Sequence, residues 1–125
     1  MPDITYRPDW PVLITGGAGF IGCNLAGRLL SQGRPVLLYD NLSRPGVEQN
    51  LDWLRREYPG RVQIEVADMR DRYALRRAVQ RASRIFHLAA QVAVTTSLTD
   101  PVEDFGVNAL GALNLLEEIR ALDQP

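Results

Sequence analysis

Glycines near the start of the chain have the spacing of a turn that can bind phosphate groups. Residues 15–22 read TGGAGFIG. They contain G-x-G-x-x-G at Gly17, Gly19 and Gly22, and a G-x-x-G-x-x-G pattern begins at Gly16. Glycine lets the backbone turn sharply and lets a diphosphate approach it without a Cβ in the way. A helix that begins at such a turn offers N–H groups and a partial positive charge to the phosphates.

The segments on either side of the glycines decide whether they form more than an ordinary turn. Residues 11–15 (PVLIT) are a short apolar run typical of a buried strand, and residues 20–32 have the apolar spacing of a helix that Gly33 ends. This strand–turn–helix order, within a βαβ unit of about 30 residues, is the context that a dinucleotide-binding motif requires. A lysine-containing phosphate loop is excluded, because all fourteen basic residues are arginine.

Asp40 follows the second predicted strand, residues 35–39, and is the second candidate for chemistry. A carboxylate at this strand end can accept hydrogen bonds from the adenosine ribose hydroxyls, and it repels the 2′-phosphate of NADP, which favours NAD. Two alternatives remain open. Asp40 also fits an ordinary turn aspartate before Asn41, and Arg44 nearby could meet a 2′-phosphate.

Asp68 follows a third strand, residues 61–66, whose alternating pattern indicates a sheet edge. Its carboxylate is placed to accept a hydrogen bond from the adenine amino group, with Met69 packing on the ring. The alternative is a loop aspartate before a helix.

Other notable side chains are expected to be structural. We interpret His87 as a core residue, Cys23 as a packing residue, and Trp53 and Tyr58 as cover for the second helix.

The remaining pattern alternates strands with helices. A helix is expected over residues 47–58, another after an Asp71 cap, a fourth strand over 85–88, and a long helix over 101–122. This order predicts an α/β, Rossmann-type, doubly wound parallel sheet with strand order 3-2-1-4, incomplete at about four strands. We expect residues 1–10 to be an extension and 11–125 a partial dinucleotide-binding domain. The long helix should pack inward through Phe105, Ala109, Leu113, Leu116 and Ile119.

Length and charge bound the remaining possibilities. The chain has 125 residues, a net charge of −1 and no basic stripe, so we expect neither nucleic acid nor a membrane as a partner. It contains no apolar run long enough for a membrane span, and its first ten residues contain no signal-peptide core. With a single cysteine, Cys23, the chain is expected to be cytoplasmic.

Taken together, these residues resemble the extended short-chain dehydrogenase/reductase family of nucleotide-sugar epimerases and dehydratases. The resemblance covers residues 11–122, and within the family it is greatest to the CDP-tyvelose (CDP-paratose) 2-epimerases. The stretches that match the family are 15–22, 40–43 (DNLS), 68–70 (DMR), 87–90 (HLAA) and 104–108 (DFGVN), followed by Gly111. The stretches that resemble the 2-epimerases are 40–46 (DNLSRPG), 50–54 (NLDWL) and 87–97 (HLAAQVAVTTS).

The resemblance implies a cofactor, NAD, and a nucleotide-diphosphate sugar as substrate, with a CDP-sugar favoured. Thr96 and Ser97 would face the sugar, and Asn108 would support the nicotinamide region by hydrogen bonding. A homo-oligomer is implied as well, paired through the long helix. The expected cofactor-binding residues are Gly16, Gly19, Phe20, Ile21, Gly22, Asp40, Asn41, Ser43, Arg44, Asp68, Met69, Leu88, Ala89, Ala90, Gln91 and Asn108.

Two departures from the family pattern stand out. Some 4-epimerases carry a lysine where this chain has Val92, which argues against that branch, and Ala112 stands where a threonine is common. The family's chemistry uses Tyr-x-x-x-Lys, in which a tyrosinate removes a hydroxyl proton as hydride moves to NAD. A 2-epimerase would pass through a transient ketone.

No catalytic pair is expected within these residues, because the chain has no lysine. Its tyrosines are followed four residues later by Trp10, Ser43, Val62 and Arg77. We therefore expect the catalytic residues beyond residue 125, no metal site, and no activity of this chain alone. The alternatives are a stand-alone NAD-binding or redox-sensing module, a UDP- or GDP-sugar 4-epimerase or dehydratase, and a purely structural piece.

Overall fold

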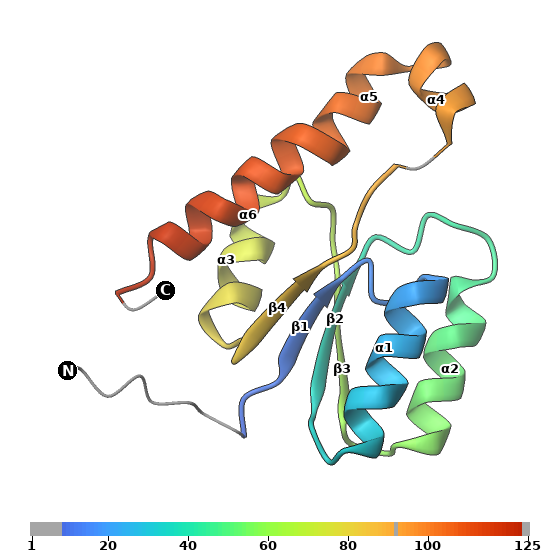
Figure 1. The fold of residues 1–125 in the computed structure, drawn as a ribbon, viewed down its shortest axis with the longest axis vertical. Coiled ribbons are helices and arrows are strands. Elements are labelled where there is room, and N and C mark those ends of the chain that lie inside the picture. Colours follow the sequence, from blue (N-terminus) through green and yellow to red (C-terminus); the bar gives the residue numbers. More distant parts are fainter. Residues whose placement is uncertain (1–8, 92, 124–125) are drawn as a thin grey trace.

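The computed structural model describes residues 9–91 and 93–123 and shows one parallel sheet in the order β3-β2-β1-β4. This confirms the predicted order 3-2-1-4 (Figure 1). The central strands are β1 (Val12–Thr15) and β2 (Val36–Asp40), and the edges are β3 (Val62–Val66) and β4 (Arg84–His87). Thr15 is in register with Tyr39 on one side and His87 on the other, so the residues that follow these strands emerge together.

Helices cover both faces of the sheet (Figure 1). On one face lie α1 (Phe20–Ser31) and α2 (Val47–Glu57), and on the other lie α3 (Arg72–Gln80) and α6 (Gly111–Arg120). Residues of β1 and β2 are therefore buried in two directions, which explains why both strands are continuous apolar runs. The fold is the doubly wound arrangement that the alternation of strands and helices predicts.

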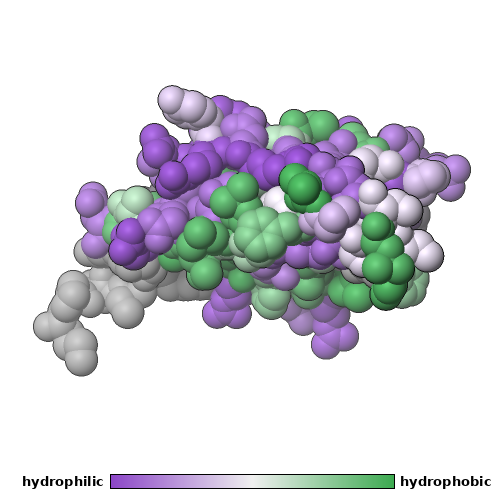
Figure 2. All heavy atoms as spheres, turned by 90° about the horizontal axis from the view of Figure 1, so that it is seen from above, coloured by the Kyte–Doolittle hydropathy of each residue, from purple (hydrophilic) through white to green (hydrophobic). Residues whose placement is uncertain are grey.

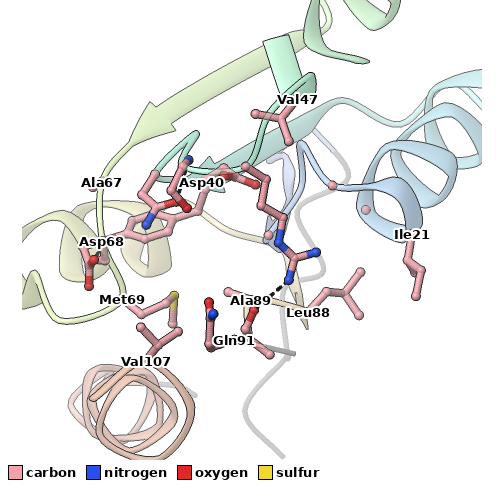
Figure 3. Close-up of a pocket in the computed structure, with 18 of the residues that line it drawn as sticks. Ile21, Asp40, Val47, Ala67, Asp68, Met69, Leu88, Ala89, Gln91 and Val107 are labelled. Carbon is pink, nitrogen blue, oxygen red and sulfur yellow. Dashed lines mark hydrogen bonds between the residues drawn. The ribbon is translucent and has the colours of Figure 1, made fainter. Parts of the chain in front are cut away.

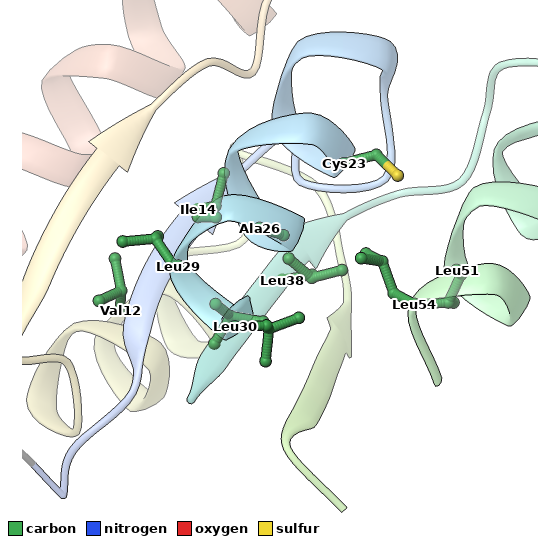
Figure 4. Packing of buried hydrophobic residues seen from close by; sticks show 10 residues of the cluster. Val12, Ile14, Cys23, Ala26, Leu29, Leu30, Leu38, Leu51 and Leu54 are labelled. Atoms are coloured by element: carbon green, nitrogen blue, oxygen red, sulfur yellow. The ribbon is translucent and has the colours of Figure 1, made fainter. Parts of the chain in front are cut away.

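The core between the sheet and the first two helices contains Leu29 and Leu30 of α1 and Leu51 and Leu54 of α2 (Figure 4). Cys23 is a buried free thiol in this cluster, as predicted, and desolvation raises the pKa of that thiol. Trp53 of α2 is 42% exposed, and its ring lies against Gly27 of α1. Tyr58 packs at the edge of the same core. Both aromatic residues therefore cover α2 and its neighbours.

The long helical segment differs from its prediction. It consists of α5 (Pro101–Phe105), a π-helical turn η1 (Gly106–Leu110) and α6, and it is preceded by a short helix, α4 (Val94–Thr99), that sequence reasoning missed. The expected inward set is mostly wrong, because Ala109 is exposed and Phe105, Leu113 and Leu116 are 65%, 53% and 62% exposed. Only Ile119 packs against the core. The inward side is formed by Gly106, Gly111, Asn114, Leu115 and Glu118.

The physical reason is the contact between the helix and the β3–α3 loop. A Cβ added at Gly111 would lie 2.8 Å from the Met69 Cβ, so a glycine is needed where the two backbones approach. Asn114 donates to the Met69 carbonyl at 3.3 Å. These contacts place small and polar residues inward, and the π turn changes the phase between the two ends of the helix.

His87 is a second correction, because its side chain is exposed rather than buried in a core. In the described part of the chain β4 has a strand on one side only, which leaves its outer edge without a neighbouring strand.

Among the described residues, no helix combines the length and apolar character needed to cross a membrane.

Candidate dinucleotide-binding site

A pocket of about 440 Å³ lies at the carboxyl ends of the strands (Figure 3). This end of the molecule, seen from above in Figure 2, carries hydrophobic side chains among hydrophilic ones. Strand order reverses between β1 and β4, and crevices at such switch points are where open α/β sheets bind ligands. The predicted cofactor residues that line the pocket are Gly16, Gly19, Phe20, Ile21, Gly22, Asp40, Asn41, Ser43, Arg44, Asp68, Met69, Leu88, Ala89, Ala90 and Gln91.

The glycine turn forms one wall of the pocket and requires glycine for several reasons. Gly16 has a φ of +69°, and a Cβ there would lie 2.9 Å from the Ala89 nitrogen. A Cβ at Gly22 would collide with the Gly16 carbonyl oxygen. Gly17 instead packs away from the pocket, where a Cβ would lie 2.7 Å from the Leu38 Cδ2. Gly19 precedes α1 without a side-chain cap, and the first residues of α1, Phe20, Ile21 and Gly22, line the pocket. No cap side chain therefore occupies the first N–H groups of this helix.

Asp40 points back to the glycine turn. Its Oδ2 accepts a hydrogen bond from the Ala18 N–H at 3.0 Å, and its Oδ1 accepts one from the Leu42 N–H at 2.8 Å. Leu42 has a φ of +58°, an uncommon conformation for leucine that this bond helps to hold. Asn50 of α2 donates to the Ala18 carbonyl at 2.8 Å. The Ala18 residue is therefore held at both its N–H and its carbonyl.

Asp68 and Met69 form the wall farther along the sheet. Hydrogen bonds from Arg70, and from the Asn41 side chain, hold the pKa of Asp68 below its usual range, so the carboxylate is ionised. The Tyr39 hydroxyl donates to the Asp68 carbonyl at 2.6 Å and fixes this loop from beneath. Burial raises the pKa of Tyr39, which keeps the hydroxyl protonated as a donor.

The 88–91 loop is held by Thr15. The Thr15 Oγ1 accepts from the N–H groups of Leu88 and Ala89 at 3.1 and 3.2 Å. It lies 2.6 Å from the His87 Nδ1, so its own proton is donated to that nitrogen. His87 is therefore neutral with its proton on Nε2. Desolvation of the ring lowers the pKa of His87, which also favours the neutral form.

Asn108 holds the other side of that loop from the π-helical turn. Its Oδ1 accepts from the Gln91 N–H at 2.7 Å, and its Nδ2 donates to the Gln91 carbonyl at 3.0 Å. Asn108 does not line the pocket itself. It contacts the pocket only through Gln91, and its support of the nicotinamide region stays a prediction.

Arg44 reaches across the pocket. Its Nη2 donates to the Ala90 carbonyl at 3.1 Å, which joins the loop after β2 to the loop after β4 (Figure 3). Arg44 is the residue that could meet the 2′-phosphate of NADP. In this structure its guanidinium is hydrogen-bonded to a backbone carbonyl instead.

Some of the predicted site residues lie outside the pocket, and some residues that line the pocket were not predicted. Thr96 and Ser97 lie on α4 and do not line it, and Val92 lies outside the described residues. Tyr39 and Ala67 could have been found, because each directly precedes a predicted carboxylate. No local signal marks Val47, Glu103 or Val107, which reach the pocket only through the fold. Among the described residues, no group of three or more His, Cys, Asp or Glu side chains could hold a metal ion.

Comparison with known proteins agrees with this geometry. The family model described as GDP-mannose 4,6 dehydratase matches residues 13–125. The CDP-paratose 2-epimerase of Salmonella typhi is 45% identical over 111 residues, which cover 87% of this chain and 32% of the epimerase.

Solved structures of nucleotide-sugar epimerases also match this chain. The UDP-glucose 4-epimerase of Thermus thermophilus, solved in complex with NAD, matches with a TM-score of 0.73 and 42% identity, covering 88% of this chain and 33% of that one. The UDP-glucose 4-epimerase of Bifidobacterium longum, in complex with NAD+ and UDP, matches with a TM-score of 0.76 and 30% identity, covering 88% and 33%. The chain spans about a third of the length of these relatives.

Proposed function

Because the chain belongs to the GDP-mannose 4,6 dehydratase family, we propose that it binds NAD in the pocket at the carboxyl ends of its strands, as the cofactor-binding part of a nucleotide-sugar epimerase. The observation that carries this proposal is the contact between Asp40 and the glycine turn. The Asp40 carboxylate lies 3.0 Å from the Ala18 nitrogen, so the ribose-binding and diphosphate-binding groups stand side by side.

The pocket offers a place for each part of the dinucleotide. The start of α1 with Gly16, Gly19 and Gly22 suits the diphosphate, because it combines N–H groups with the helix dipole. Asp40 suits the adenosine ribose, and Asp68 with Met69 suits the adenine. The nicotinamide half would lie over residues 88–91, held from behind by Thr15 and Asn108.

The chemistry of the whole protein is the wider part of the proposal. NAD, when bound, supplies a hydride acceptor. We assign this chain the tasks of binding the dinucleotide, orienting it through the 88–91 loop, and presenting Thr96 and Ser97 to the sugar. The Tyr-x-x-x-Lys pair would come from outside these residues, because this chain contains no lysine, and the chain alone would be inactive.

A CDP-sugar is the substrate that we favour, with epimerisation at carbon 2 through a transient ketone. The support is the 45% identity to the CDP-paratose 2-epimerase of Salmonella typhi, together with the DNLSRPG and NLDWL stretches. We also propose a cytoplasmic homo-oligomer.

A UDP-sugar 4-epimerase is the second candidate. It is favoured by the 42% identity to the Thermus thermophilus UDP-glucose 4-epimerase, nearly as high as that to the CDP-sugar enzyme. Turnover of CDP-sugars against UDP-sugars by a protein that carries both this sequence and a Tyr-x-x-x-Lys pair separates the two.

Calorimetric titration of the chain with NAD and NADP tests the proposal. We expect saturable binding of NAD and at least about tenfold weaker binding of NADP, which corresponds to about 1.4 kcal/mol. Asp40→Asn keeps the shape of the side chain but removes its charge, so it should weaken NAD binding and reduce the preference over NADP. Asp52→Asn, on the exposed side of α2, is the matched control and should change neither. Absence of a binding signal with NAD would refute the proposal.

A further inference from the structure

One guanidinium joins two carboxylates of the pocket wall. Arg70 donates through Nε and Nη2 to the two oxygens of Asp68, at 2.8 and 2.9 Å. Through Nη1 and Nη2 it donates to the two oxygens of Glu103, at 2.8 and 3.3 Å. Asp68 and Glu103 line the pocket, whereas Arg70 does not.

The fold builds this cluster from two distant segments. Asp68 and Arg70 belong to the β3–α3 loop, and Glu103 lies on α5, where Asp100 caps the helix by accepting from the Glu103 N–H at 3.1 Å. The Arg70 side chain crosses Gly106, where an added Cβ would lie 3.3 Å from the Arg70 Cδ. A glycine at this position leaves room for the arginine.

The cluster has a larger effect on the orientation of the two carboxylates than on the free energy of unfolding. The side chains of Asp68 and Glu103 are 30% and 44% exposed, and ion pairs at that exposure contribute little to the free energy of unfolding. A planar guanidinium that binds side-on, however, fixes the plane of a carboxylate.

The hydrogen bonds also limit which acceptor positions Asp68 has left. Its Oδ1 accepts from both the backbone N–H and the Nε of Arg70, and its Oδ2 accepts from Nη2. A carboxylate has about four acceptor positions. Arg70 therefore leaves about one, on Oδ2, for an amide such as that of Asn41 or for a donor on a ligand.

We infer that Arg70 is the positioning residue for recognition of the adenine 6-amino group, because it holds Asp68 in one orientation and anchors it to Glu103 on α5. This inference rests on the proposed NAD binding and deepens it. The same contact ties the adenine end of the pocket to the helical segment that carries Asn108, so one arginine supports both ends of the site.

The test compares NAD with nicotinamide hypoxanthine dinucleotide, in which a carbonyl replaces the 6-amino group. The chain should bind NAD about five to ten times more tightly, the effect of one hydrogen bond. In Arg70→Met this ratio should fall to about one, because Asp68 is no longer held in place. Arg70→Lys should recover the ratio only in part, since an ammonium cannot bind both carboxylates side-on.

Arg77→Met is the matched control. Arg77 also pairs with a carboxylate, Glu65, at 2.5 Å, but neither residue lines the pocket. It should keep the ratio, and circular dichroism should show both variants folded. A purely structural effect of Arg70 would weaken both dinucleotides equally and leave the ratio unchanged, which would overturn the inference. A ratio of one in the unaltered chain would overturn it as well, with NAD binding intact, whereas no binding of NAD would refute the proposed function itself.

Discussion

At the scale of single residues, the glycines of residues 15–22 have different physical reasons for being glycine. Gly16 needs a positive φ and a close approach to Ala89, whereas Gly22 must leave room for the Gly16 carbonyl. Gly17 is required by packing against Leu38. The sequence pattern treats these positions alike, but Gly16 and Gly22 line the pocket and Gly17 does not.

Gly22→Ala should damage the site while sparing most of the fold. Its Cβ collides with the Gly16 carbonyl oxygen and would lie 2.7 Å from the Gly17 Cα, so the turn must shift. We expect NAD affinity to fall by at least about tenfold, or about 1.4 kcal/mol, measured by calorimetry. Gly27→Ala, in the same helix, meets Trp53 at an ordinary 3.5 Å and should bind NAD normally. It should also melt at an equal or higher temperature, because alanine favours a helix by about 1 kcal/mol. Equal affinities in the two variants would contradict this reading of the turn.

At the scale of elements, α6 is attached to α3 by a buried carboxylate. The Glu118 side chain is 2% exposed and pairs with Arg72 and Arg76 of α3, each at 3.0 Å. The two guanidiniums hold the pKa of Glu118 below its ordinary value, with the hydrogen bond from Arg76 as the main cause. Because α5, η1 and α6 follow one another directly, this anchor also sets where Glu103 meets the pocket and where Asn108 meets Gln91.

Glu118→Gln should lower the free energy of unfolding at neutral pH by about 1–3 kcal/mol, since it removes charge from two hydrogen bonds. The folded-state pKa of Glu118 lies below its unfolded value, so the ionised form stabilises the fold above that unfolded value, near 4.5. The contribution is lost as the pH falls through the folded-state pKa. Urea unfolding of both proteins at several pH values should therefore show a difference that is large at pH 7 and shrinks under acid conditions.

The control for this prediction is Glu117→Gln. Glu117 is adjacent but more exposed, and it pairs with Arg120 of its own helix. Its substitution should leave stability nearly unchanged at every pH. A difference for Glu118→Gln that did not depend on pH would exclude the charge as the cause.

At the scale of the whole molecule, two surfaces are open to another protein. One is the outer edge of β4, which pairs with no strand among the described residues, so that its backbone groups can pair with a strand of another protein. The other is an apolar stripe on the outward side of α5, η1 and α6, formed by Val102, Phe105, Leu110, Leu113 and Leu116. Three of the residues expected to face the core, Phe105, Leu113 and Leu116, thus belong to a surface that suits a second copy of the chain.

The chain should therefore self-associate, and the stripe should contribute to it. Sedimentation velocity should show species larger than a monomer for the unaltered chain and a lower average mass for the double variant Leu113→Glu, Leu116→Glu. Tyr73→Glu, at an exposed position of α3, is the control and should behave like the unaltered chain. A monodisperse monomer of the unaltered chain would contradict the prediction, and unchanged association of the double variant would assign it to the β4 edge instead.

Much of the fold was predictable because its determinants are local. The central strands are short apolar runs, β3 alternates, and each of the first three helices has a periodic apolar side. The positions of these elements therefore agree with prediction to within a residue or two. Right-handed crossovers then leave few ways to order the strands. Parallel strands end at one side of the sheet, which brings Asp40, Asp68 and the 88–91 loop to the glycine turn.

Sequence alone therefore determined the strand order, the glycine turn and the carboxylates beside it, since each depends on residues close together in the chain. Tertiary structure decided what depends on distant contacts: the partners of Arg70, the exposure of His87 and the π-helical turn that brings Asn108 to Gln91. It also decided which side of α6 faces inward. An apolar stripe shows that a helix has an apolar side, but the close approach of Gly111 to Met69 places that side outward.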